Sequence, residues 1–207
     1  MNRVIKTFII NILLILSAQT LFAEEHVFAP DEHCLAYKTE KSVLFVADVE
    51  VIGKSCEVTA KMNWNHSGEK AQVKVSVPVI SLDSNNAFRD EDIPEILRVD
   101  QTYDIRFISD WLEIEVLKKM LQEKKGEVSG ILEVAGGKFP VKFMMTFTSK
   151  PEYYLVTGHL NTTFAALNVD VPDVAWGLVA QPKEFLELLV HLRSDKISGA
   201  ERLAIQQ

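Results

Sequence analysis

Side chains along this chain alternate between apolar and polar with a period of two, and no other feature of the sequence restricts the fold as strongly. In the clearest run, Val73, Val75 and Val77 share one parity while Lys74 and Ser76 take the other. Successive side chains of a β-strand point to opposite faces of the sheet, so this period predicts a strand with one buried face. Six other runs show the same pattern. Their inward residues are Val43, Phe45, Ala47, Val49 and Val51; Val58, Ala60, Met62 and Trp64; Ile105 and Phe107; Val141, Phe143, Met145 and Phe147; Val156, Leu160 and Phe164; and Leu186, Leu188, Val190 and Leu192.

Turn-forming residues separate these runs at near-regular spacing. They include Gly53, Ser67-Gly68, Gly136-Gly137 and Lys150-Pro151. Many short strands with turns between them are typical of antiparallel barrels and sandwiches, so we predict an all-β fold. Gly136-Gly137 lacks the strand–loop–helix context of a phosphate-binding loop, and we expect a hairpin turn there.

Two stretches depart from the alternation and predict short helices. Residues 90–99 carry apolar side chains at helical spacing, and we place Pro94 near the start of that helix, where proline is tolerated. Residues 112–125 begin with alternation and end with a helical pattern. We therefore expect a strand end there that passes into a short helix closing at Gly126.

Residues 1–23 show the order of features that defines a secretory signal peptide. A short basic start with Arg3 and Lys6 is followed by an apolar run and then by Ala23. We expect cleavage after Ala23, with a cut after Ala18 as the alternative. The rival interpretation is a retained membrane anchor, but the apolar run is shorter than the about 20 residues that a spanning helix needs. Cleavage predicts a periplasmic protein, or a secreted one in a cell without an outer membrane.

The chain of 207 residues is acidic, with 22 Lys and Arg against 29 Asp and Glu. Proteins that bind nucleic acid neutralise phosphates with clustered basic side chains, so this charge balance argues against that class. Charged residues make up 25% and hydrophobic residues 47%, which excludes a disordered chain and a polytopic membrane protein. We expect one domain over 24–198 and a frayed C-terminal tail over 199–207.

Cys34 and Cys56 are the only cysteines of the chain. An oxidising compartment permits a disulfide between them, and both fall where we predict the first strand and its returning partner. Two buried thiols remain the alternative, because sequence position does not fix the distance between two Cβ atoms. The chain has neither a CxxC nor an HxxxH spacing, so we predict no metal site.

No group of residues in the sequence points to catalysis. Ser81 and Ser84 lie in one predicted loop, and neither has the Gly-x-Ser-x-Gly surroundings of a nucleophile elbow. Four histidines fall on different predicted elements without ligand spacing, and we expect surface or hydrogen-bonding roles for them. They are His33, His66, His159 and His191. We therefore predict that the protein is not an enzyme.

The inward residues of the predicted strands are uniformly apolar and include large Phe and Met side chains. Two interpretations follow from this pattern. The residues fill a solid core, or the strands close into a barrel whose interior holds an apolar ligand. A barrel of about eight strands is wide enough for either, so the alternation does not choose between them.

The stretch from Val75 to Asp90 resembles the signature of the YceI-like family. A valine-rich strand is followed by a loop with Ser81, Asp83 and Ser84 and then by an Arg-Asp pair that opens a helix. Further similar segments span most of residues 33–193. They are Glu95 to Asp100, Tyr103 to Phe107, Gly130 to Val134, Gly137 to Val141, and more weakly Gly158 to Leu160 with Phe164 and Pro172. The chain departs from the family at Tyr103-Asp104, where a proline usually precedes the strand.

The resemblance implies an exported, antiparallel, lipocalin-like β-barrel with one or two short helices and an apolar lumen. It also implies an isoprenoid or quinone-like lipid as the ligand, no other cofactor, and a homodimer paired through exposed strands. A long apolar tail gains about 0.8 kcal/mol for each buried CH₂ group, which suits such a lumen. The candidate ligand-binding residues are Phe45, Trp64, Val75, Val77, Phe107, Phe143, Met145, Phe147, Leu160, Phe164, Leu188 and Val190.

Arg89 and Asp90 are candidates for contact with a ligand head group near a barrel mouth. Their alternative role is structural, because an acid near a helix N-terminus is stabilised by the helix dipole and Arg89 pairs readily with an acid. The alternative function for the whole chain is a ligand-free structural or protein-interaction module of the cell envelope, with a packed barrel core.

Overall fold

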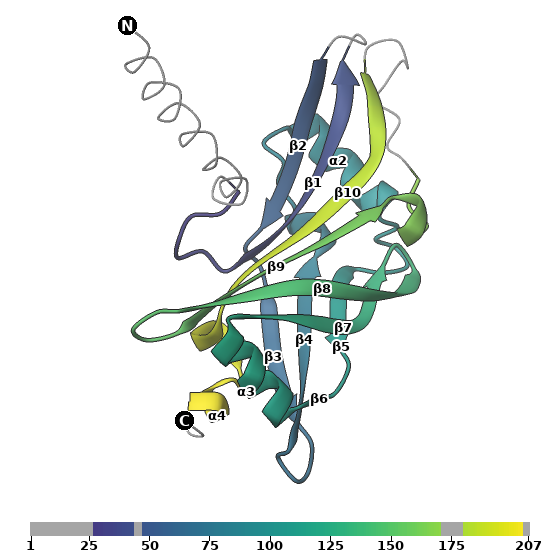
Figure 1. The fold of residues 1–207 in the computed structure, drawn as a ribbon. Coiled ribbons are helices and arrows are strands. Elements are labelled where there is room, and N and C mark those ends of the chain that lie inside the picture. The colour runs from purple at the N-terminus through teal and green to yellow at the C-terminus, as the bar shows by residue number, and fades with distance from the viewer. Residues whose placement is uncertain (1–26, 44–46, 171–179, 205–207) are drawn as a thin grey trace, which may run out of the picture. The chain divides into compact units, whose positions relative to one another are not determined.

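A single curled β-sheet makes up most of the structure, which is a computed structural model and describes residues 27–43, 47–170 and 180–204. Figure 1 shows the strands wrapping around a common interior. The strands are β1 (Cys34–Val43), β2 (Ala47–Ser55), β3 (Thr59–Trp64), β4 (Lys70–Pro78), β5 (Asp104–Ser109), β6 (Leu112–Glu113), β7 (Lys125–Val134), β8 (Gly137–Ser149), β9 (Tyr154–Thr163), β10 (Ala180–Arg193) and β11 (Ile197–Ser198).

The strand order is β11-β3-β4-β5-β7-β8-β9-β10-β1-β2, and β6 adds to β4. Among the described strands every pairing is antiparallel except β11 with β3, which is parallel. Lys54 of β2 also forms a reciprocal pair of backbone hydrogen bonds with Asp83, which follows β4, at 2.8 and 2.9 Å. The outermost strand β2 is thereby tied back to the β4 side of the sheet. The predicted all-β, lipocalin-like barrel is confirmed.

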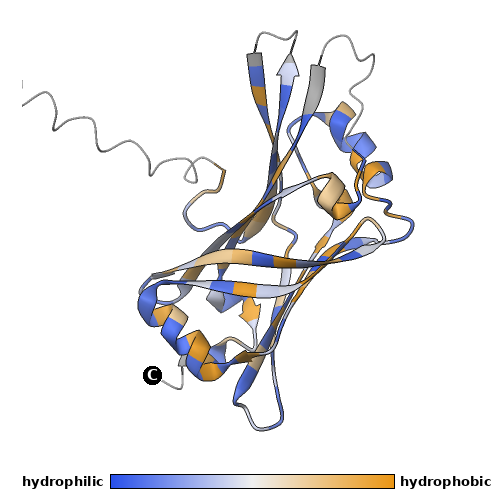
Figure 2. Cartoon of the chain, turned by 45° about the vertical axis from the view of Figure 1, so that its right-hand side comes forward, coloured by the Kyte–Doolittle hydropathy of each residue, from blue (hydrophilic) through white to orange (hydrophobic). Residues whose placement is uncertain are grey.

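Alternation along the strands gives the barrel its apolar interior. Figure 2 shows hydrophobic residues interspersed with hydrophilic ones along the strands. In β7, Val128, Gly130, Leu132 and Val134 are buried, and the residues between them are partly or fully exposed. One face of the sheet therefore supplies the core, as the period of two requires.

The predicted strand over residues 43–51 is instead a hairpin. Val43 of β1 pairs with Ala47 of β2, so the chain reverses between them, and Phe45 lies outside the described residues. Cross-strand partners point to the same face of a sheet. Thr39 of β1 and Val51 of β2 are such partners, so residues of the same parity in the two strands share a face and the alternation carries through the reversal.

Two of the three described α-helices begin earlier than the sequence indicates. Helix α2 (Ala87–Ile96) starts after Asn86, whose side-chain oxygen accepts the backbone N–H of Arg89 at 3.2 Å. Pro94 consequently falls in the last turn of α2, not in the first. Helix α3 (Ile114–Glu123) follows β6, as the predicted change from strand to helix requires.

The third helix, α4 (Glu201–Ala204), corrects the expectation of a frayed tail after Ser198. Ala200 is buried just before it. The first 23 residues, predicted to be a signal peptide, lie outside the described part of the chain. Within that described part, no helix has the length and apolar character needed to cross a membrane.

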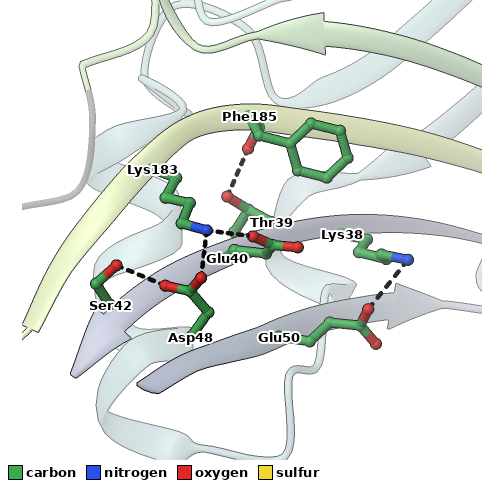
Figure 3. Close-up of polar contacts among 8 residues, drawn as sticks. All are labelled: Lys38, Thr39, Glu40, Ser42, Asp48, Glu50, Lys183 and Phe185. Atoms are coloured by element: carbon green, nitrogen blue, oxygen red, sulfur yellow. Dashed lines mark hydrogen bonds and ion pairs between the residues drawn. The ribbon is translucent and has the colours of Figure 1, made fainter. Parts of the chain in front are cut away.

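A polar network joins the C-terminal part of β1 to the N-terminal parts of β2 and β10 (Figure 3). Between the pairs Thr39↔Leu186 and Lys41↔Pro182, one residue of β1 faces three residues of β10, which is an irregular bulge. Lys183 in this bulge donates to Glu40 at 2.8 Å and to Asp48 at 2.7 Å, and these hydrogen bonds raise the pKa of Lys183. The network joins three strands at the point where β10 changes register.

Cys34 and Cys56 are joined by a disulfide, and Cys34 is completely buried. The bond links the first residue of β1 to the residue that follows β2. The β1–β2 hairpin therefore forms a covalently closed loop, which is joined at the first residue of β1.

Candidate functional site

The barrel interior contains two apolar cavities. Cavity 1, of about 190 Å³, is lined by strand side chains such as Val75, Phe107 and Phe143, and also by residues of α3 and of the segment after β10. Cavity 2, of about 340 Å³, lies toward α2 and includes Ile93 and Phe164 in its wall. The sheet therefore encloses open apolar space instead of packing its inward side chains into a solid core.

The two cavities adjoin one another along the lumen. Five residues line both of them, and we call these residues the waist: Tyr37, Leu82, Ile105, Leu132 and Leu188. The two cavities are therefore neighbours that share the side chains of the waist as part of their walls.

Tyr37 at the waist lies over Gly53, its partner on β2. A Cβ atom at position 53 would stand only 2.2 Å from Cε1 of the Tyr37 ring, so any other residue at this position would displace the ring. Burial raises the pKa of the Tyr37 phenol, while Arg89 and a hydrogen bond with Ser84 act in the opposite direction. The Tyr37 hydroxyl therefore belongs to a polar group beside the lumen.

That polar group is centred on Ser84, which is buried at the start of the α2 region. The Ser84 hydroxyl donates to Asp90, and the Ser84 backbone N–H also donates to Asp90 at 3.1 Å. Arg89 donates from Nε to the Ser84 hydroxyl at 2.6 Å and from Nη2 to the Ser84 carbonyl at 2.8 Å. Arg89 and Asp90 thus have structural partners, but Arg89 also lines cavity 2.

Nine of the twelve residues predicted from the sequence to bind a ligand line a cavity. Those on cavity 1 are Val75, Val77, Phe107, Phe143, Met145, Phe147 and Val190; Phe164 lines cavity 2, and Leu188 lines both. Phe107 and Phe143 meet edge to face, with ring centroids 5.3 Å apart. The inward parity of several separate strands therefore converges on one space.

The other three predicted residues do not line either cavity in the described structure. Phe45 lies outside the described residues. Leu160 is partly buried on β9, and only its cross-strand partner Leu188 reaches the lumen. The indole of Trp64, at the end of β3, instead donates from Nε1 to the carbonyl of Gly199 at 2.9 Å.

Several lining residues lie outside the strongest alternating runs and are not among those predicted from the sequence. Leu117 and Leu121 of α3 line cavity 1, and their spacing of four residues is the signal for one apolar helix face. Leu132 of β7 belongs to an alternating run that contains Gly130, and this glycine weakens the pattern. Tyr37 and Leu82 carry no comparable signal in the sequence.

The described residues show one group of side chains close enough to share a metal ion: Glu32, Cys34 and Cys56. Both thiols are consumed by the disulfide, and Glu32 pairs with Lys54 at 2.9 Å. This group therefore does not have the donor set of a metal site.

Two of the predicted histidine positions are more enclosed than surface residues. His33 and His191 are each 7% exposed. His33 accepts the backbone N–H of Arg193 on Nδ1 at 3.1 Å, and Nδ1 of His191 lies 3.0 Å from the carbonyl of Glu32. Both histidines have the hydrogen-bonding role that the sequence analysis gave as one alternative.

Two solved structures share the fold of this chain although their sequences are no more than 13% identical to it. BcnA from Burkholderia cenocepacia has a TM-score of 0.59 at 13% identity, over 77% of this chain and 95% of that chain. A polyisoprenoid binding domain from Saccharophagus degradans, implicated in plant cell wall breakdown, has a TM-score of 0.54 at 9% identity, over 77% and 92% of the two chains. A search of curated protein sequences finds no match.

The family comparison covers most of the barrel. The model of the YceI-like domain matches residues 36–193, which run from β1 to the end of β10. This range contains the segment from Val75 to Asp90, the waist and nearly all of the strands. The chain therefore belongs to the YceI-like family.

Proposed function

We propose that this protein binds an isoprenoid-type or other long-chain apolar lipid in its barrel lumen. The observation that carries the proposal is the lining of cavity 1, where Tyr37, Tyr154 and Ser194 have the only polar side chains among the described residues. An apolar chain gains about 0.8 kcal/mol for each CH₂ group that enters such a space. A charged group would lose its hydration there without a partner. The Saccharophagus degradans domain of the same fold, described as polyisoprenoid binding, supports this ligand class.

The dimensions of the lumen suit an elongated ligand. A protein cavity of about 150 Å³ that is lined by apolar side chains holds a benzene molecule. Cavity 1, at about 190 Å³, therefore has room for a short section of an apolar chain, and cavity 2 adjoins it at the waist.

We place the polar end of the ligand in cavity 2. Polar and charged side chains occur there beside apolar ones, and they include Thr39, Lys41, Arg89 and Asp92. Asn86, Phe88 and Asp92 of this cavity are solvent exposed, so its α2 side reaches water. In this arrangement Arg89 faces the head group, while Asp90 holds Ser84 and so supports Arg89 indirectly.

We further propose that the mature protein acts in the periplasm as a carrier. The signal-like order of residues 1–23 and the disulfide between Cys34 and Cys56 both favour an oxidising compartment outside the cytoplasm. The intact mass of the protein recovered from its own cell envelope tests this directly. A mass that corresponds to a chain beginning at Glu24 agrees with export. A mass that corresponds to a chain with residues 1–23 still attached contradicts it.

Native mass spectrometry of that same material tests lipid binding. We expect a stoichiometric added mass that organic extraction releases as a polyprenyl or quinone-type lipid. A protein without added mass that also fails to take up such lipids in solution contradicts the proposal and favours the envelope-interaction module.

Adjacent residues of β8 offer a matched pair of variants. Phe143 is buried and lines cavity 1, whereas Met144 is 47% exposed on the other face of the strand. We expect Phe143→Asp to weaken binding of a long-chain prenol by roughly 100-fold or more, because the carboxylate would be desolvated by the ligand. Met144→Asp should bind as the unmodified protein does.

Displacement of a lipophilic fluorescent dye measures both affinities, and far-ultraviolet circular dichroism checks that each variant is folded. If Phe143→Asp does not fold, Met145→Asp on the same face of β8 provides the second test. Equal prenol affinity in folded Phe143→Asp and Met144→Asp would exclude the lumen as the binding site.

A further inference from the structure

The segment after β10 packs into the same hydrophobic cluster as α3 and lines cavity 1. We call residues Ile197–Ala204 the C-terminal segment; it contains β11 and α4 and lies beyond the stretch that the family model matches. Figure 1 shows α4 at the same end of the sheet as α3. Ile197 and Ala200 belong to the same buried cluster as Leu117 of α3 and Met62 of β3. The C-terminal segment therefore packs beside α3 at this end of the sheet.

Three side chains of the C-terminal segment form part of the wall of cavity 1. Ile197 and Ala200 are each 7% exposed, and Leu203 packs against their cluster. Leu117 and Leu121 of α3 line the same cavity from the neighbouring element. A ligand chain that extends through cavity 1 away from the waist would thus meet the C-terminal segment and α3.

Several contacts hold the C-terminal segment in place. Ile197 and Ser198 pair in parallel with Ala60 and Lys61 of β3. The Trp64 indole donates to the Gly199 carbonyl at 2.9 Å, and the Arg202 guanidinium lies 4.9 Å from the centre of a Trp64 ring. Trp64 therefore acts on the lumen through the C-terminal segment instead of lining it.

Gly199 lets this attachment form. Its φ of +89° lies in the region that favours glycine, and a Cβ atom there would stand 2.2 Å from the backbone oxygen of Met62. The segment consequently makes its turn directly against β3, and the turn directs α4 and Leu203 toward the end of cavity 1.

We propose that the C-terminal segment sets the length of apolar chain that the lumen accepts, with Leu203 as the specificity-determining residue at the end of cavity 1. This inference rests on the proposed lipid-binding function and deepens it. Leu203 lines cavity 1 beside Ile197 and Ala200 of the same segment, and it stands on a helix of four residues. A smaller side chain at 203 lengthens the accessible space, and a larger one shortens it.

Two substitutions at one position test the proposal in opposite directions. Leu203→Ala should raise the affinity for geranylgeraniol relative to farnesol, and Leu203→Trp should lower this ratio. Leu203→Ala removes three carbon atoms from the wall, and burial of every two further methylene groups of a ligand corresponds to about tenfold in affinity, so we expect a shift of roughly tenfold or more. Val116→Ala is the matched control, because Val116 is 44% exposed on α3 and does not line cavity 1.

Dye displacement with farnesol, geranylgeraniol and solanesol gives the ratios for each protein, and thermal unfolding followed by circular dichroism establishes that each variant is folded. Opposite shifts in the two Leu203 variants, with an unchanged ratio in Val116→Ala, support the inference. If the unmodified protein binds prenols and neither Leu203 variant changes the ratio, the inference is wrong and the lipid-binding function stands. If the unmodified protein binds none of the three prenols, the proposed function is wrong and the inference falls with it.

Discussion

His33 occupies a site that favours the neutral imidazole. Its Nδ1 accepts the backbone N–H of Arg193, so the ring proton must be on Nε2, and Nε2 is buried without a hydrogen-bond partner among the described residues. Burial lowers the pKa of His33, and the nearby Lys196 lowers it further. Protonation would place a second donor on Nδ1, facing the Arg193 N–H.

The depressed pKa of His33 predicts acid sensitivity. As the pH falls below the ordinary histidine value of 6.5, the unfolded chain takes up a proton that the folded protein resists, so the free energy of unfolding decreases. His33→Asn keeps an acceptor for Arg193 and removes the titrating group. Urea denaturation at a series of pH values should show a smaller acid-induced loss in this variant.

His66→Asn is the control for this experiment, because His66 is exposed in the turn region after β3. We expect its pH profile to match that of the unmodified protein. Identical profiles for all three proteins between neutral and mildly acidic pH would show that His33 does not cause the loss of stability in acid.

Single residues also show where sequence reasoning reaches its limit. The parity of Val75, Phe107 and Phe143 predicted the side of the strand correctly, because the pleat alone determines it. Trp64 has the same parity as its neighbours, but its indole N–H requires an acceptor. That acceptor is Gly199, which lies 135 residues later in the chain, so no local pattern predicts the contact.

The element with the most informative boundary is α3. The sequence predicts that this helix closes at Gly126, whereas the left-handed residue at its end is Lys124, with φ of 58°. Gly126 lies within β7, where the Met120 side chain of α3 approaches its backbone. Glycine thus marks a close contact between helix and strand here, which a search for helix-ending residues confuses with a cap.

Lys124→Gly should consequently stabilise the protein. A non-glycine residue in the left-handed region is strained, and relief of that strain outweighs the extra freedom of glycine in the unfolded chain. We expect the free energy of unfolding to rise by about 0.5–1 kcal/mol. Equilibrium denaturation in urea measures it.

Lys125→Gly provides the comparison one residue further along. Lys125 opens β7 and is absent from the described residues with positive φ, so glycine there should lower stability by about 0.5–1 kcal/mol. Destabilisation by both glycine variants would show that the αL conformation at Lys124 carries no strain.

At the scale of the whole molecule, the disulfide between Cys34 and Cys56 fastens the β1–β2 hairpin to the sheet. The two cysteines are 22 residues apart, and closing a loop of this length in the unfolded chain accounts for about 3 kcal/mol of stability. Replacing both cysteines by alanine should lower the free energy of unfolding by about this amount. Urea unfolding of the variant, and of the unmodified protein with and without dithiothreitol, gives the comparison. A double variant as stable as the oxidised protein would contradict this prediction.

The class of fold could be predicted from the sequence because alternation and turns recur through nearly the whole chain. The presence of open space inside the barrel could not, since a packed core and a hollow lumen need the same inward parity. The space arises from relations that are not local, such as Tyr37 lying over Gly53 and Leu203 lining cavity 1. Those relations appear only when the strands are brought together.

The contrast between the two ends of the lumen has a kinetic consequence. Exposed residues border cavity 2 near α2, while residues of α3 and the C-terminal segment line cavity 1. If the proposed lipid exchanges only on the α2 side, it loads and unloads through the same opening, so an incoming molecule waits until the resident one has left. The observed exchange rate then equals the dissociation rate and does not rise with the concentration of competing lipid. Such a protein would release its ligand at a fixed rate, independent of the concentration of lipid around it.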